Sequence, residues 1–118
     1  MTLLSQGSYG GGIKKELKLI RESKEFELIY RKLNRTKKIE VDVPYIDFSQ
    51  DVVVLYQHGE TKGTLIPSLK IIGKTQNTII LEVLEQEDKN GGRNITRPFC
   101  MYTLTKISKK MNAKLKND

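Results

Sequence analysis

The sequence predicts an α+β domain in which one helix, at about residues 23–34, packs on a largely antiparallel β-sheet of five or six strands. Most of this prediction comes from three apolar runs rich in β-branched side chains, 52–56, 65–72 and 78–84. Short polar segments that carry glycine separate these runs, which is the pattern of an antiparallel meander. A stretch with helical apolar spacing, 26–33, precedes them. The pattern leaves open whether the sheet curls into a barrel-like or a sandwich-like arrangement.

The length of 118 residues fits a single domain, because a chain of this size buries roughly two-thirds of its unfolded surface without help from a metal or a disulfide. We expect this domain to span residues 13–108. Residues 1–12 end in three glycines and have little to bury, so they predict a flexible lead. Residues 109–118 predict a frayed basic tail.

The first elements are a strand and a helix. Residues 13–21 alternate with Ile13 on the apolar face, which predicts a strand with one solvated side. Ser23 is placed to accept hydrogen bonds from the first free amides of the helix, and Asn34 to end it. An apolar stripe on this helix must cover one face of the sheet, and it consists of Phe26, Ile29, Tyr30 and Leu33.

The remaining elements are strands. Alternation over 39–43 predicts a short strand that Pro44 ends. The all-apolar run 52–56 is typical of a central strand covered on both faces. Pro67 removes a ladder donor from the following run and so indicates an edge position or a bulge, and residues 99–107 close the sheet.

Two connections stand out, and we interpret both as hairpin loops. Segment 57–64 has glycines four residues apart, Gly59 and Gly63, but lacks the spacing, the lysine and the following helix of a phosphate-binding loop. Segment 86–98 is long for a hairpin connection, and long loops commonly carry function.

No constellation of catalytic or metal-binding residues is found. The only histidine, His58, has no second ligand at metal-binding spacing. Cys100, the single cysteine, allows no internal disulfide and would need His58 beside it to act as a nucleophile, so a buried structural thiol is expected. We therefore expect no enzymatic activity, no metal and no cofactor. No run approaches the roughly 18 apolar residues of a membrane span, and the first residues lack the features of a signal peptide.

The net charge of +7 introduces an alternative function, because clustered lysine and arginine bind phosphate backbones without sequence specificity. The basic residues are spread along the chain, with clusters only at 31–38 and 106–116. No aromatic and basic signature of an RNA-binding strand accompanies them. We interpret most of the charge as solvated surface and keep electrostatic binding of nucleic acid or an anionic surface through these clusters as the alternative.

Several motifs recur in the order seen in a known family. After a strand and a helix they are Ile46-Asp47-Phe48-Ser49, Val52-Val53-Val54-Leu55, Gly59-Glu60 through Gly63, Ile71-Ile72, Ile80-Leu81-Glu82-Val83 and Thr96-Arg97-Pro98-Phe99-Cys100. Over about residues 13–108 the chain resembles the protease-regulatory PrcB C-terminal-domain family, small bacterial extracytoplasmic domains often found in lipoproteins. One departure is Gly63-Thr64-Leu65, where the family tends to have Gly-Gly-Tyr.

The resemblance implies a non-enzymatic domain that binds or stabilises a protease complex in the periplasm or at the cell surface, with its signal segment absent from this chain. A cytoplasmic location is expected instead if Met1 is the native start. We expect the partner to contact loops 57–64 and 86–98, and a protease inhibitor that inserts these loops into an active-site cleft is a variant of the same prediction. The candidate contact residues are Gly59, Gly63, Thr64, Gly91, Gly92, Arg93, Arg97, Pro98 and Phe99.

Overall fold

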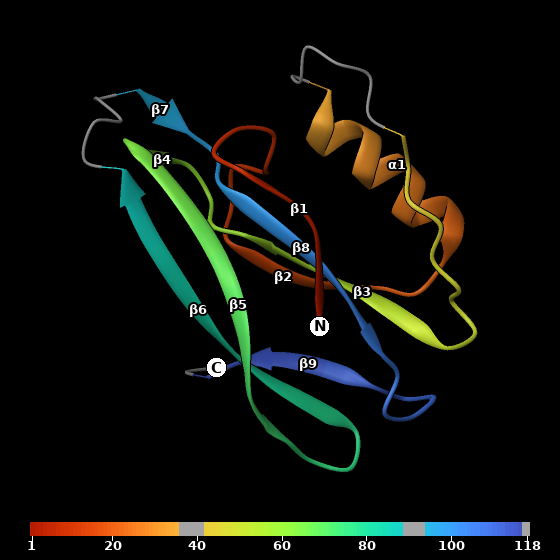
Figure 1. Cartoon of the computed structure of the whole chain (residues 1–118). Helices are drawn as coiled ribbons and strands as arrows, with labels where there is room; N and C mark the ends of the chain where they lie inside the picture. The colour runs from red at the N-terminus through yellow and green to blue at the C-terminus, as the bar shows by residue number, and fades with distance from the viewer. Residues whose placement is uncertain (36–41, 89–93, 117–118) are drawn as a thin grey trace.

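The computed structural model describes residues 1–35, 42–88 and 94–116, and this part of the chain has nine strands and one helix (Figure 1). The elements are β1 (Thr2–Gly7), β2 (Glu16–Ile20), α1 (Ser23–Asn34), β3 (Asp51–Gln57), β4 (Thr61–Lys62), β5 (Thr64–Lys74), β6 (Thr78–Asp88), β7 (Ile95–Thr96), β8 (Phe99–Thr105) and β9 (Asn112–Leu115). All strand pairs are antiparallel except β6 with β9. The predicted α+β class, a mostly antiparallel sheet with one helix, is confirmed.

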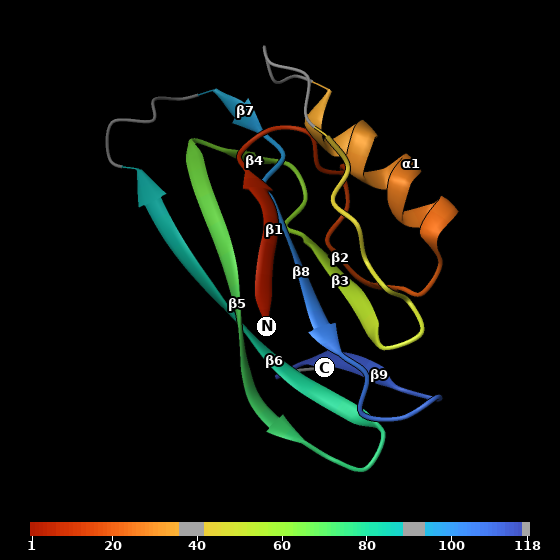
Figure 2. The same ribbon diagram turned by 45° about the vertical axis from the view of Figure 1, so that its right-hand side comes forward.

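The strands form three sheets. The largest has the order β1-β8-β3-β2, a second has the order β5-β6-β9, and the short β4 and β7 pair with each other. The two larger sheets pack against each other through one core cluster, and α1 covers the other face of the four-stranded sheet (Figures 1 and 2). The described strands do not close into a barrel.

β3 lies at the centre of these layers. Its residues 52–56 are all buried, because alternate side chains point to opposite faces and both faces are covered. Val54 and Tyr56 pack in the core between the two sheets, whereas Val53 and Leu55 pack beneath α1. The predicted central strand is confirmed.

The helix has the expected stripe but a different N-terminus. Phe26, Tyr30 and Leu33 are buried, and Ile29 is partly buried beside them. The prediction that Ser23 caps the helix is wrong, because Ser23 is already helical and the extended residue before it makes no side-chain cap. Glu25 lies in the first turn, and Arg31 and Lys32 lie in the last. At these positions each charge interacts favourably with the helix dipole and stabilises the helix.

Both ends of the chain differ from the expectation of a flexible lead at 1–12 and a frayed tail at 109–118. The first residues form β1 because β8 offers a free edge for pairing, and the Ser5 hydroxyl donates to Asn34 Oδ1 at 2.9 Å in a buried contact with the helix end. At the other end β9 pairs with β6, and Met111 is fully buried in the core between the sheets. Long-range pairing therefore orders segments that have little local signal.

The connectivity also differs from the predicted meander. β3 and β5 belong to different sheets, so segment 57–64 is a crossing between sheets and not a hairpin loop. The connection 86–98 likewise joins different sheets, and its first residues extend β6. Among the described strands only β5 and β6 form a hairpin, and at its turn the Thr75 N–H donates to the Thr78 carbonyl oxygen at 2.8 Å. β5 is an edge strand, as Pro67 indicated.

Five of the predicted strands correspond to β2, β3, β5, β6 and β8. The predicted strand at 39–43 lies mostly outside the described residues, and Val43, which is described, is not in a strand. Ile13 was expected in the first strand, but β2 begins three residues later and Ile13 is exposed. Among the described residues, no helix has the length and apolar character needed to cross a bilayer.

Candidate functional site

The two sequence segments predicted to contact a partner meet at one end of the molecule. β4 and β7 pair there, and the His58 N–H donates to the Pro98 carbonyl oxygen at 3.0 Å. The Gly63 N–H donates to the Asn94 carbonyl oxygen at 2.8 Å, and the Thr96 hydroxyl donates to the Gly63 carbonyl oxygen at 2.7 Å. These bonds join segments 57–64 and 94–98 into one unit.

A third segment, the glycine-rich stretch 8–12, packs on this unit. The Arg97 N–H donates to the Ser8 carbonyl oxygen at 2.8 Å, and the Gly11 N–H donates back to the Arg97 carbonyl oxygen at 3.0 Å. The Gly12 N–H donates to Gln57 Oε1. Three stretches that are far apart in sequence are therefore fixed to one another by backbone and side-chain hydrogen bonds.

Two glycines explain why the chain can follow this path. Gly10 has φ +105°, and a Cβ on it would lie 2.3 Å from the carbonyl oxygen of Leu33 at the end of α1. Gly59 has φ +91°, and a Cβ on it would lie 3.1 Å from the backbone nitrogen of Lys15. Residues other than glycine rarely adopt such backbone conformations. Glycine at both positions therefore allows the neighbouring chain segments to approach closely.

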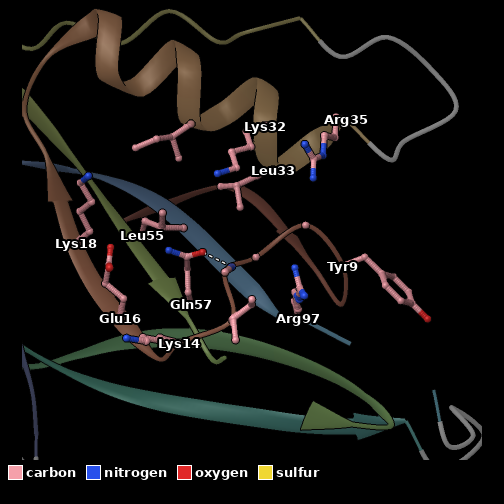
Figure 3. Close-up of a pocket in the computed structure, with 15 residues that line it drawn as sticks. Tyr9, Lys14, Glu16, Lys18, Lys32, Leu33, Arg35, Leu55, Gln57 and Arg97 are labelled. Atoms are coloured by element: carbon pink, nitrogen blue, oxygen red, sulfur yellow. Dashed lines mark hydrogen bonds between the residues drawn. The ribbon is translucent and has the colours of Figure 1, made fainter. Parts of the chain in front are cut away.

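A groove of about 750 Å³ lies between the glycine stretch, the C-terminal half of α1 and the ends of β2 and β3 (Figure 3). Apolar side chains of Ile29, Leu33 and Leu55 form part of its wall. In the part of the chain that the structure describes, the charged side chains around it are five cations and one carboxylate, namely Lys14, Lys18, Lys32, Arg35, Arg97 and Glu16. Positive charge is therefore in clear excess.

Two of the five cations have an acidic partner. Lys18 Nζ lies 3.5 Å from Glu25 Oε1, and Arg97 Nη2 lies 3.2 Å from Glu60 Oε2. Both pairs are well exposed, so each contributes little to stability. Within residues 1–35, 42–88 and 94–116, the other three cations, Lys14, Lys32 and Arg35, form no ion pair.

Gln57 adds an oriented donor to the groove. Its Oε1 accepts the Gly12 N–H, and this bond directs the Nε2 amide group toward the groove (dashed line in Figure 3). In the same view Lys32 and Arg35 approach the space from the helix and Arg97 from the opposite side, while Lys14 lies at the edge of the site beneath Glu16. The groove can therefore surround a negatively charged group with hydrogen-bond donors from several segments.

The predicted contact residues differ in how accessible they are. Arg97 is exposed and borders the groove, whereas Gly63 and Thr64 are half-buried beside β4. Three of the predicted contact residues are buried by the crossing segments or the core and offer a partner little accessible surface, namely Gly59, Pro98 and Phe99. Three further predicted residues lie outside the described part of the chain, and these are Gly91, Gly92 and Arg93.

Several groove residues were not predicted. Lys14 was counted with the solvated surface charge, and residues 10–12 with the flexible lead, while Lys32 belonged to the basic cluster 31–38 of the alternative function. The three consecutive glycines were the available signal, since such a run also suits a close approach between backbone segments. The positions of the cations could not be inferred, because they come together only through the packing of α1 on the sheet.

The thiol and the imidazole have ordinary structural surroundings. Cys100 is fully buried in the core between the sheets, and burial raises the pKa of its thiol to about 12, so the thiol is protonated near neutral pH. His58 Nε2 lies 3.4 Å from Glu85 Oε1. Among the described residues, no group of three histidine, cysteine or acidic side chains is arranged to hold a metal ion.

Comparisons of the chain with protein-family models, with curated proteins and with solved structures gave no match. The fold defines an α+β protein, and the groove is the candidate site at one end of it. The resemblance to the PrcB C-terminal-domain family stays a prediction from the sequence. A functional interpretation has to start from the chemistry of the groove itself.

Proposed function

We propose that the protein is a non-catalytic binding module that contacts a partner protein through its groove end, defined here as segments 8–14, 57–64 and 94–98. The observation that supports this proposal most directly is the hydrogen-bonded junction of these three segments around one groove. Binding residues are commonly carried by connecting segments that a rigid scaffold positions. The central strand β3, with residues 52–56 buried, is that scaffold here.

The resemblance adds a more specific proposal, in which the partner is a protease or a protease complex at the cell surface or in the periplasm. Binding or stabilising that complex is the activity we propose first. An inhibitor that inserts these segments into an active-site cleft belongs to the same class, and an assay of protease activity with and without the protein separates the two.

Nucleic-acid binding has less support. The described parts of the two basic clusters lie in different layers, since α1 covers one face of the four-stranded sheet and β9 packs on the other. They therefore do not combine into one continuous surface of the kind that neutralises several phosphates.

A site-specific photo-crosslinking experiment tests the proposal. A photoreactive phenylalanine analogue replaces Ile13, which is 62% exposed at the groove, or Ile72, which is 42% exposed near the far end of β5. Each protein is illuminated in an extract of its source cells. We expect a crosslinked protein from position 13 that excess unmodified protein abolishes, and no such product from position 72. Equal products from both positions, or none from position 13, would contradict the proposal.

A further inference from the structure

We infer that the groove binds an acidic segment of the partner protein, in which carboxylates meet Lys14, Lys32 and Arg35 and an apolar side chain packs on the groove wall. This inference rests on the proposed function and specifies the chemistry that the partner must offer. Three observations on the described residues lead to it: the charge, the donors and the apolar wall.

Three of the five cations at the groove have no ion-pair partner within the described chain. Lys14 precedes β2, while Lys32 and Arg35 belong to the last turn and the end of α1, yet all three border the same space. Like charges gathered at one site repel each other, and an opposite charge placed between them relieves that repulsion. A ligand with more than one carboxylate therefore gains more binding free energy in this groove than it would at an isolated surface lysine.

The polar side chains that line the groove are mostly hydrogen-bond donors. The ammonium and guanidinium groups accept no hydrogen bonds, and the Gln57 amide presents Nε2 because its Oε1 is occupied by Gly12. Glu16 is the one carboxylate among the described residues that line the groove. A ligand rich in acceptors, such as a run of aspartate or glutamate, complements this arrangement.

The apolar wall distinguishes a peptide from a phosphate chain. Ile29, Leu33 and Leu55 line the groove next to the cations, so an apolar side chain can be removed from water there. The aromatic ring at the rim, Tyr9, points away from the space in Figure 3, and bases of single-stranded nucleic acid need aromatic faces directed at them. The volume of about 750 Å³ suits a few residues and not a long chain.

Fluorescence anisotropy with defined probes tests the inference. The main probe is a labelled peptide of glutamate and leucine residues. Its matched control replaces every glutamate with glutamine, and two further probes are a short single-stranded DNA and inorganic pyrophosphate. We expect the acidic peptide to bind, its affinity to fall as salt rises from about 50 to 200 mM, and the glutamine peptide to bind at least about tenfold more weakly.

Matched charge reversals locate the binding. The double variant Lys14→Glu with Lys32→Glu changes two exposed groove residues, and we expect it to lose about tenfold or more of the affinity. The control, Lys74→Glu with Lys114→Glu, makes the same change in net charge on the three-stranded sheet and should alter affinity by less than about twofold. Circular dichroism verifies that both variants fold.

Several results would overturn the inference. Equal affinity for the acidic and glutamine peptides would show that carboxylates are not recognised, and equal losses in both double variants would show that only net charge matters. Binding of DNA or pyrophosphate without the acidic peptide would assign the groove to phosphate. If none of the probes binds, the groove is not a binding site for anionic ligands. A crosslinked partner that persists in the groove variant would leave the proposed function standing while this inference fails.

Discussion

Replacing Gly10 with alanine tests whether the glycine stretch is held against the helix. The new Cβ would lie 2.3 Å from the Leu33 carbonyl oxygen, a backbone atom that cannot turn aside as a flexible side chain can. The backbone at φ +105° also disfavours any residue with a Cβ, by about 1–3 kcal/mol. Displacing the stretch would further weaken the bond from Gly11 to Arg97, worth about 0.5–1.5 kcal/mol. We expect a loss of about 2–4 kcal/mol in the free energy of unfolding.

Urea unfolding followed by far-UV circular dichroism measures this loss. Gly73→Ala is the matched control, because its Cβ would meet Ile80 Cδ1 at an ordinary 3.5 Å and its φ is not in the left-handed region. The control should change the free energy of unfolding by less than about 1 kcal/mol. If the alanine at position 10 were no more destabilising than the control, residues 8–12 would not be fixed as described, and the groove would lose one of its sides.

Three further predictions concern the core and the junction. Met111→Ala should lower the free energy of unfolding by about 2–5 kcal/mol, because Met111 is fully buried, whereas Leu28→Ala on the exposed helix face should change it by less than about 0.5 kcal/mol in the same urea titration. Thr96→Val should cost about 1–2 kcal/mol by removing the hydrogen bond to the half-buried Gly63 carbonyl oxygen, and a loss below about 0.5 kcal/mol would show that this bond does not hold the junction. Burial raises the pKa of Cys100 from 9.0 to about 12, so the folded state holds the thiol proton more tightly than the unfolded state does. The stability that this difference contributes is present below about pH 9 and is lost as the pH rises toward 12. Unfolding free energies measured across this range should fall less steeply in Cys100→Ala than in the parent protein.

The elements with a strong local pattern were predictable. Residues 52–56 form a short, β-branched run that is apolar at every position, which favours a strand covered on both faces, and β3 has that environment. The helix was predictable from the spacing of Phe26, Tyr30 and Leu33, since these residues fall on one face. In both segments, neighbours in sequence are sufficient to specify the structure.

The ends of the chain were not predictable for the opposite reason. β1 pairs with β8, almost the full length of the chain away, and a six-residue strand that depends on a distant edge has a weak local signal. β9 is four residues long and depends on β6 in the same way. The expected lead and tail were therefore interpreted from glycine content and charge, which describe the isolated segment and not its partner.

The candidate site was predictable only in part. Segments 57–64 and 86–98 were chosen as glycine-bearing connections, and the structure brings 57–64 together with the described residues 94–98. Phe99 was included because it follows the loop, yet as the first residue of β8 it points into the core beneath α1. Lys14 and Lys32 reach the same groove only through the packing of the helix, which sequence spacing does not encode.

A titration of the ¹⁵N-labelled protein with the acidic peptide tests the central claim most directly, because nuclear magnetic resonance reports each amide separately. We expect the largest chemical-shift changes at the backbone amides of residues 10–12 and at the Gln57 side-chain amide, with the tip of the β5–β6 hairpin at residues 75–77 unchanged. Shifts spread evenly over exposed lysines on both layers, or centred on the three-stranded sheet, would contradict a binding site in the groove.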